Sequence, residues 1–268
     1  MRVAVIGANG FIGARLVERL HLEKGADVVP VVRRPEAAAS AMRFDLTCRV
    51  ADALDGPALA AALTGCDAVV HAGAGDRRFV VESPETVARA AAKAGARKVV
   101  YLSSMAVHGW SPQKPVDEAS PLPEEHALPY NAWKVAAEKM SRASCAQEGL
   151  SLVVLRPGIV HGPRSRWISS FAEALVEGRA AVVNGGTAIC NGIYVDNLCA
   201  AVRRALEQLG LPEADLHALP DSEKRFPDGA QYRFEIPSTE GPRCLEAVLE
   251  EAERLDVRVH RVSQGSGV

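Results

Sequence analysis

The sequence of 268 residues predicts an α/β protein built on a doubly wound parallel sheet. Up to about residue 155, short apolar runs rich in β-branched residues alternate with stretches of helical periodicity, which is typical of parallel β-α-β units. The first run, Val3 to Ile6, has no polar position, as expected of a strand buried on both faces. It leads through a glycine-rich turn directly into a helical pattern. In such sheets, ligands bind beyond the carboxyl ends of the strands.

The turn is Gly7-Ala8-Asn9-Gly10-Phe11-Ile12-Gly13, with glycines spaced G-x-x-G-x-x-G. The free N–H groups and the dipole of a helix start attract an anion such as a diphosphate. Gly7 permits the turn, Gly10 lets phosphates approach the backbone, and Gly13 lets the helix pack closely on the strand. The alternative is a tight turn without a nucleotide. The strand before the turn and the helix after it favour a dinucleotide site.

The second predicted strand, residues 27–32, contains Pro30, and we expect a local irregularity there because proline cannot donate to a ladder. Arg33 and Arg34 follow, where an NAD site usually has an acidic residue. Guanidinium groups bind a 2′-phosphate well, so the pair favours NADP over NAD. The alternative is that both arginines only form a solvent-exposed strand end, and NAD stays open.

Further strands are predicted to end near residue 51 and to span 67–71, 97–104 and 152–155, with helices over 57–63, 86–94 and 130–148. Asp52 either accepts a hydrogen bond from the adenine amino group or caps its own turn. The loop that begins Ala72-Gly73 has small residues, which let backbone pass close to a cofactor.

The pattern is looser after residue 155. Its predicted elements are a helix over 167–177, strands over 181–183 and 193–195, a helix over 196–208, and a strand, helix and strand over 232–236, 244–255 and 257–262. We expect residues 1–160, with 187–208 returning to them, to form the dinucleotide-binding core. Residues 161–186 and 209–268 are then a small C-terminal α+β substrate lobe.

Tyr130 and Lys134 are four residues apart and share one helix face. A phenol with an ordinary pKa near 10 is a poor base unless a neighbouring cation stabilises its phenolate, and Lys134 is that cation. Lys134 also reaches a nicotinamide ribose. A serine at the end of the preceding strand is placed to hold a substrate oxygen.

Together these motifs resemble the extended branch of the short-chain dehydrogenase/reductase superfamily, which includes the NAD(P)-dependent epimerase/dehydratase proteins and has a Rossmann fold. The segments that carry the resemblance are Gly7 to Gly13, Asp52, His71 to Gly73, Ser103 to Gly109, Tyr130 to Lys134, Arg156 to Pro163, and Tyr194 to Leu198. The resemblance implies that Tyr130 is the acid/base, Lys134 its pKa partner and ribose ligand, and Ser104 the carbonyl-orienting hydroxyl. Ser104, rather than Ser103, has the usual distance from Gly109.

The full set of cofactor-binding residues predicted is Gly7, Asn9, Gly10, Phe11, Ile12, Gly13, Arg33, Arg34, Asp52, Ala53, Ala72, Gly73, Tyr130, Lys134, Pro157 and Gly158. The family often has tyrosine where His108 and His161 stand, and either histidine faces substrate or has a structural role. Met105 and Ala106 replace the acidic pair of sugar-nucleotide dehydratases, which argues against 4,6-dehydration.

The predicted function is an NADP-preferring oxidoreductase acting on a carbonyl or secondary alcohol of a small organic substrate. The alternatives are a nucleotide-sugar epimerase that retains NAD and a non-catalytic dinucleotide-sensing module. A net charge of −2 gives no reason to expect nucleic acid, and no apolar run reaches the ~20 residues of a membrane helix. The scattered cysteines lack a C-x-x-C pair, so we expect no metal and a cytoplasmic protein. A homodimer stays open.

Overall fold

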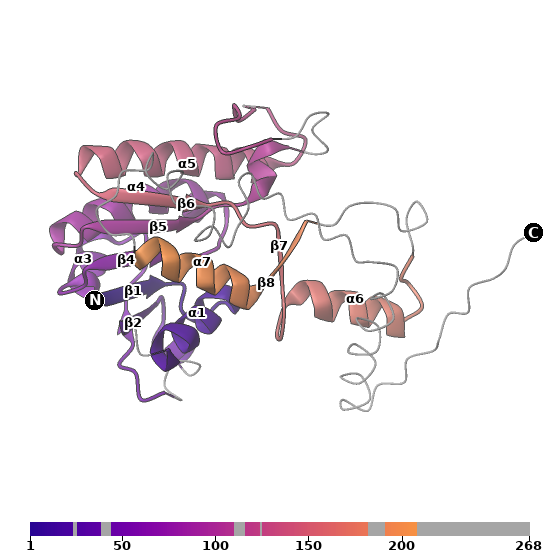
Figure 1. The fold of residues 1–268 in the computed structure, drawn as a ribbon, viewed down its shortest axis with the longest axis horizontal. Helices are drawn as coiled ribbons and strands as arrows, with labels where there is room; N and C mark the ends of the chain where they lie inside the picture. Colours follow the sequence, from indigo (N-terminus) through magenta and orange to yellow (C-terminus); the bar gives the residue numbers. More distant parts are fainter. Residues whose placement is uncertain (24–25, 39–43, 110–115, 124, 182–190, 208–268) are drawn as a thin grey trace, which may run out of the picture.

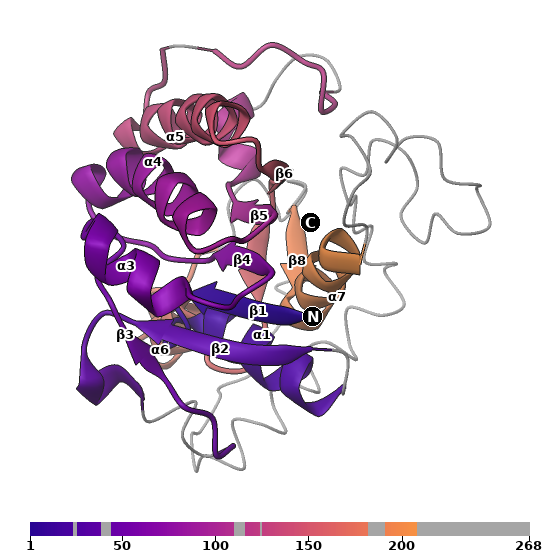
Figure 2. The same cartoon turned by 90° about the vertical axis from the view of Figure 1, so that its left-hand side faces the viewer.

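A computed structural model of the protein describes residues 1–23, 26–38, 44–109, 116–123, 125–181 and 191–207. Its main sheet has six parallel strands in the order β3-β2-β1-β4-β5-β6. Strands β2, β1, β4, β5 and β6 are labelled in Figure 1, and β3 is labelled in Figure 2. The strands are β1 Arg2–Ile6, β2 Asp27–Val32, β3 Arg49–Val50, β4 Ala68–His71, β5 Lys98–Leu102 and β6 Ser151–Leu155. The strand order reverses between β1 and β4, which makes the fold doubly wound, as predicted.

Helices cover both faces of this sheet (Figure 2). On one face lie α1 Phe11–Leu22 and α7 Val195–Glu207, and on the other lie α3 Gly56–Leu63, α4 Arg77–Lys93 and α5 Pro129–Gln147. Two hydrophobic clusters result because successive side chains of a strand point to opposite faces. Val3 and Val5 join the cluster under α1 and α7, whereas Ala4 and Ile6 join the one under α3 and α4.

The irregularity expected at Pro30 is absent, because the register of β1 against β2 continues through Val5 opposite Pro30. The amide of Asp27 and the carbonyl of Val31 bond to the β1 side. Successive residues of a strand point their backbone N–H groups to alternate neighbours, so an N–H at position 30 would point toward β3 rather than β1. Pairing with β3 begins only at Val31, and the proline therefore removes no ladder bond.

Helix α4 begins nine residues earlier than the predicted Thr86, at Arg77. The carboxylate of Asp76 accepts a hydrogen bond from the amide of Phe79, which is an N-cap. Pro84 lies inside the helix and is buried. The predicted start at Thr86 was wrong, because the Asp76 cap begins the helix earlier and the helix continues through Pro84 despite the hydrogen bond that a proline removes.

A second, two-stranded parallel sheet pairs β7 Ile159–His161 with β8 Gly192–Tyr194. Strand β8 matches the predicted 193–195, whereas β7 was not predicted. Helix α6 Arg166–Val176 follows β7, and none of its residues is buried. The predicted elements between 232 and 262, and most of the predicted substrate lobe, fall outside the described residues. The division into core and lobe stays a prediction.

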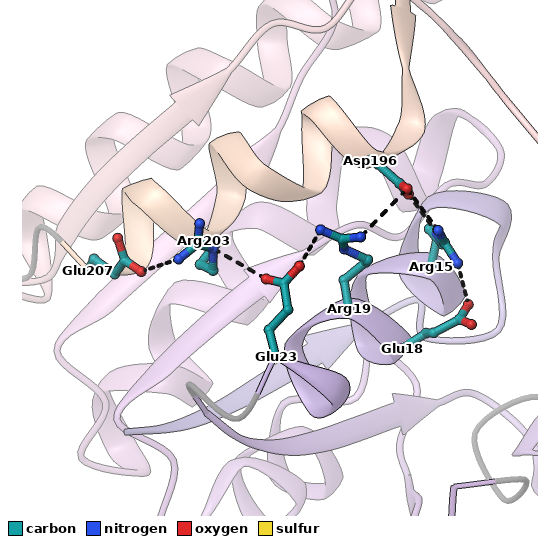
Figure 3. A network of polar contacts seen from close by, with 7 residues as sticks. All are labelled: Arg15, Glu18, Arg19, Glu23, Asp196, Arg203 and Glu207. Atoms are coloured by element: carbon teal, nitrogen blue, oxygen red, sulfur yellow. Dashed lines mark hydrogen bonds and ion pairs between the residues drawn. The ribbon is translucent and has the colours of Figure 1, made fainter. Parts of the chain in front are cut away.

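Two short 3-10 helices complete the described elements, η1 Pro35–Ala38 and η2 Met105–His108. Polar contacts hold helix α7 in place near both of its ends. At its start and along its length, a network of ion pairs joins it to α1 (Figure 3). Near its end, the buried ammonium of Lys98 donates to the carbonyl of Ala205 at 2.6 Å. These contacts hold α7 beside α1 and against the start of β5.

Candidate active site

The glycine turn has the shape of a cradle that side chains would fill. Gly7 has a φ of +83°, and a Cβ there would lie 2.8 Å from the Cα of Gly73. A Cβ at Gly13 would lie 2.1 Å from the carbonyl oxygen of Gly7. Gly10 caps α1 without a side-chain hydrogen bond and is exposed. The first amides of α1 therefore face an open position, and the turn fits the diphosphate of a dinucleotide.

The close contact of Gly7 with Gly73 confirms that the loop after β4 lies beside the turn. Asn9 is exposed, whereas Phe11 and Ile12 are half-buried and pack against the core below α1. The Phe79 ring blocks any side chain at Gly73, where a Cβ would lie 2.7 Å from it.

The ends of β2 and β3 bring the predicted adenosine ligands to the same edge. Arg33 and Arg34 follow β2 and are exposed, and within the described part of the chain neither guanidinium has an ion pair. Asp52 follows β3, which pairs with the end of β2. Its Oδ1 accepts a hydrogen bond from the amide of Leu54 at 2.9 Å. The side chain of Ala53 is buried under α3, so only its backbone can face a ligand.

Lys134 lies where α5 crosses the carboxyl end of β5, and its side chain is 6% exposed. Its ammonium donates to the carbonyl of Leu102 at 3.0 Å and to the hydroxyl of Tyr101 at 3.4 Å. The ammonium also lies 5.1 Å from the centre of the Tyr101 ring. Burial lowers the pKa of Lys134 to about 8, and the charge of Glu138 acts against this lowering.

Tyr130 stands one turn before Lys134 and is 44% exposed. Its partial burial raises the pKa of the phenol above the ordinary value, because burial disfavours the phenolate. The recorded partners of the Lys134 ammonium are on β5 rather than Tyr130. The lowering of the phenol pKa that the sequence predicts therefore stays a prediction for the complex with dinucleotide.

The two neighbouring serines at the end of β5 have different partners. Ser103 is buried, and its hydroxyl donates to Oε1 of Glu138 at 2.5 Å. Ser104 is half-buried and caps η2, where its Oγ accepts from the amide of Ala106 at 3.2 Å. The Ser103 hydroxyl is thus committed to a buried carboxylate, whereas the Ser104 hydroxyl keeps its own hydrogen to donate.

Pro157 and Gly158 hold the backbone around Ser104. The carbonyl of Pro157 accepts from the amide of Met105 at 3.0 Å. A Cβ at Gly158 would lie 2.0 Å from the carbonyl oxygen of Asn191, so only glycine fits there. Their predicted contact with a cofactor stays a prediction.

Sequence reasoning gave no catalytic or positioning role to His71 and Glu138, which are buried, or to Arg156, which is partly buried and pairs with Glu138. The Nδ1 of His71 accepts from the amide of Gly73 at 3.3 Å, so Nε2 carries the hydrogen and donates to the hydroxyl of Ser83 at 2.8 Å. Burial and the charge of Lys134 lower the pKa of His71 to about 3. Glu138 is four residues after Lys134, a spacing that could have singled it out.

Both histidines that depart from the family pattern have neighbours in the structure. The Nε2 of His108 lies 3.3 Å from the guanidinium of Arg156, which can only donate, so this nitrogen accepts. The His161 ring packs against Tyr194, with centroids 5.6 Å apart. These contacts support the structural alternative for each.

The profile of the NAD dependent epimerase/dehydratase family matches residues 3–214. The chain belongs to this family. The family uses NAD or NADP, and the glycine turn of this member has the geometry described above. Among the described residues, no three His, Cys, Asp or Glu side chains gather as metal ligands, and no helix is both long and apolar enough to cross a bilayer.

Known members of the family include both reductases and epimerases. A cinnamoyl-CoA reductase 1 of Petunia hybrida is 34% identical over 60% of this chain and 55% of its own length. A UDP-glucose 4-epimerase of Mycolicibacterium smegmatis is 32% identical over 76% of this chain and 73% of its own length. The chain thus spans about half the length of the matched plant reductase.

Among solved structures, a dTDP-glucose 4,6-dehydratase of Streptomyces venezuelae with bound NAD is similar, with a TM-score of 0.67 and 27% identity. The match covers 77% of this chain and 72% of the dehydratase. The similarity supports the doubly wound fold.

Proposed function

We propose that the protein is an NADP-preferring oxidoreductase that transfers a hydride to or from a carbonyl or secondary alcohol of a small organic substrate. The observation that carries the proposal is the buried ammonium of Lys134 at the carboxyl end of β5. It stands one turn from Tyr130 and next to the strand end that carries Ser104. The glycine turn opens at the same edge of the sheet, so dinucleotide and substrate can meet there.

The roles of the side chains follow from their chemistry. The bound dinucleotide supplies or takes up the hydride. Ser104 donates a hydrogen bond to the substrate oxygen, and Tyr130 gives the proton to that oxygen during reduction and removes it during oxidation. Lys134 holds the nicotinamide ribose and, as a cation, favours the phenolate of Tyr130.

The preference for NADP rests on Arg33 and Arg34. Both guanidiniums are exposed at the end of β2 without an ion pair among the described residues, and no acidic residue occupies that position. A 2′-phosphate would give them a charge-assisted partner. Asp52 uses Oδ1 in its own turn, which leaves the other oxygen for the adenine amino group.

Several relatives are named as reductases or dehydrogenases, which is consistent with the proposal. They include a 3-beta-hydroxysteroid dehydrogenase of Mycolicibacterium neoaurum and a 2-alkyl-3-oxoalkanoate reductase of Stenotrophomonas maltophilia, both 29% identical over 78% of this chain. The second candidate is a nucleotide-sugar epimerase, which the Mycolicibacterium smegmatis relative supports. An epimerase keeps its cofactor, so NAD retained through purification would favour it, whereas a freely exchanging NADP favours the reductase.

The deciding experiment screens carbonyl compounds for loss of NADPH absorbance with wild type and Tyr130→Phe. We expect a substrate that wild type reduces, with turnover lowered by at least a hundredfold in Tyr130→Phe and with NADPH affinity preserved. Unchanged turnover in Tyr130→Phe would refute the proposed acid. No turnover with any carbonyl, together with intact dinucleotide binding, would refute the reductase and leave the epimerase and the third candidate, a dinucleotide-sensing module.

A further inference from the structure

The carboxylate of Glu138 is 1% exposed and has polar partners on two other segments, Ser103 after β5 and Arg156 after β6. Besides the Ser103 hydroxyl, it accepts from Nε of Arg156 at 3.0 Å and from the terminal nitrogen of the same guanidinium at 2.8 Å. Arg156 follows β6, so this cluster joins α5 to the ends of β5 and β6. A buried ion pair is on average no more stabilising than well-packed apolar residues. Stability alone therefore does not account for it.

The position of Glu138 relates it to both parts of the candidate site. Along α5, Tyr130, Lys134 and Glu138 follow at intervals of four residues and share one face. Across the helix–sheet boundary, Glu138 binds the side chain of Ser103, the residue immediately before Ser104. One carboxylate thus contacts the strand end that carries the substrate-orienting hydroxyl and lies one turn from the ammonium.

We infer that Glu138 is a positioning residue that keeps Lys134 charged and fixes the helix that carries Tyr130 and Lys134 against the strand end that carries Ser104. The inference rests on the proposed function for the roles of these three residues. Arg156 contributes to the same positioning. Its Nε and one terminal nitrogen donate to the two oxygens of the Glu138 carboxylate, and its other terminal nitrogen donates to Nε2 of His108.

The groups around the Lys134 ammonium agree with this role. From β5 it meets the phenol of Tyr101, whose pKa is raised by burial and by the charge of Glu138, so this phenol stays neutral. From the end of β4 it meets His71, which burial keeps neutral. Tyr130 is a neutral phenol on the same helix. Against these uncharged neighbours, the carboxylate of Glu138 opposes the loss of the lysine proton.

The test measures NADPH affinity by nicotinamide fluorescence as a function of pH, which requires no turnover. In wild type, affinity should fall as pH rises through about 8, because the ribose-binding ammonium deprotonates. Glu138→Gln keeps the size and a hydrogen-bond acceptor but removes the charge. We expect its midpoint to move down by about one pH unit, a tenfold change in proton affinity. Glu85→Gln is the matched control, since it removes a carboxylate from an exposed pair with Arg89 on α4.

An equal midpoint in wild type and Glu138→Gln, or the same shift in Glu85→Gln, would overturn the inference. If Glu138→Gln does not fold, the inference is tested instead by measuring kcat and KM of the variants Ser103→Ala and Ser103→Thr. We expect Ser103→Ala to lower kcat about tenfold with an unchanged KM for NADPH, and Ser103→Thr to restore it, whereas no loss in Ser103→Ala would overturn the inference. Absence of all carbonyl reduction would refute the proposed function and leave the binding test valid.

Discussion

Arg15 and Asp196 lie 181 positions apart in the sequence and form a two-pronged ion pair. The Nε of Arg15 donates to one carboxylate oxygen at 2.6 Å, and a terminal nitrogen donates to the other at 2.8 Å (Figure 3). Arg15 lies two residues beyond the glycine turn, and Asp196 is in the first turn of α7. The pair therefore ties the start of the helix that follows β8 to the helix that carries the anion-binding amides.

Asp196→Asn should lower the free energy of unfolding by about 1.5–3 kcal/mol, because it removes the charge from a hydrogen-bonded, partly buried pair. Urea denaturation at pH 7 measures this. The matched control is Glu207→Gln, whose pair with Arg203 is exposed and should be worth less than about 0.5 kcal/mol. The pKa of Asp196 is lowered by Arg15, so its contribution is present above the unfolded pKa and is lost as pH falls through the lowered native value. Equal losses in both variants would contradict this.

Gly13→Ala should abolish dinucleotide binding and destabilise the protein. Its new Cβ would lie 2.1 Å from the carbonyl oxygen of Gly7, and backbone cannot move away as a side chain can. Thermal unfolding and NADPH fluorescence measure the two effects. Gly56→Ala is the control on α3, where the nearest atom to the new Cβ is 3.8 Å away. A Gly13→Ala protein with wild-type affinity would show that the turn is not the phosphate site.

Arg33→Ala should weaken NADPH binding by roughly ten- to a hundredfold and leave NADH nearly unchanged, because a lost charge-assisted contact typically costs ~1.5–3 kcal/mol. Arg34→Ala, measured beside it, separates the contributions of the two guanidiniums. Isothermal titration with each cofactor gives the dissociation constants. If both cofactors lose affinity equally, the arginine does not recognise the 2′-phosphate.

Lys134→Met should raise the apparent pKa of alcohol oxidation and weaken dinucleotide binding together, because one ammonium serves both purposes. In wild type, oxidation should rise with pH through an apparent pKa well below 10. Lys134→Arg should rescue little, since a planar guanidinium differs from a compact ammonium with three donors. The measurement is a pH–rate profile at saturating substrate. An unmoved profile and affinity in Lys134→Met would mean that this pair is not catalytic.

His71 should stay neutral through the range in which most histidines titrate. Its pKa of about 3 results from burial and from the charge of Lys134, so its ring resonances should not move between pH 5 and 8. NMR of histidine-labelled protein measures this. Because the unfolded chain takes up a proton near pH 6.5 and the native imidazole does not, this group makes the fold less stable as pH falls below that value. A midpoint near 6.5 for His71 would contradict the neutral assignment.

Local sequence patterns were sufficient for five strands of the main sheet, β1, β2, β4, β5 and β6, since each contains a short apolar run. Strand β3 is only Arg49–Val50, and the sequence predicted no more than its end near residue 51. Local patterns were insufficient for β7, because Ile159–His161 is only three residues long and becomes a strand by pairing with β8 more than thirty residues later. The start of α4 was missed: the helix begins at Arg77 and includes Pro84, a residue that is locally unfavourable inside a helix.

The candidate site shows the same division. The glycine turn, Tyr130 and Lys134 are recognisable because their spacing encodes their geometry. Glu138 has a local signal in its four-residue spacing from Lys134, but its hydrogen-bond partners Ser103 and Arg156 are 35 and 18 positions away. Such pairings leave no periodic signal in a single sequence, and the fold alone brings them together.

Ser103 and Ser104 are the same residue type in adjacent positions at the end of β5, but their hydroxyls have different environments. The Ser103 hydroxyl is buried against Glu138, whereas the Ser104 hydroxyl is half-buried and caps η2. A slip of β5 by one position against its neighbours would exchange them and present Ser103 to the substrate while Ser104 turned toward the interior. The identity of the reactive serine is thus a property of strand alignment rather than of the dipeptide. We therefore expect that inserting or deleting one residue within Lys98–Leu102 abolishes activity, although Ser104, Tyr130 and Lys134 would all still be present in the sequence.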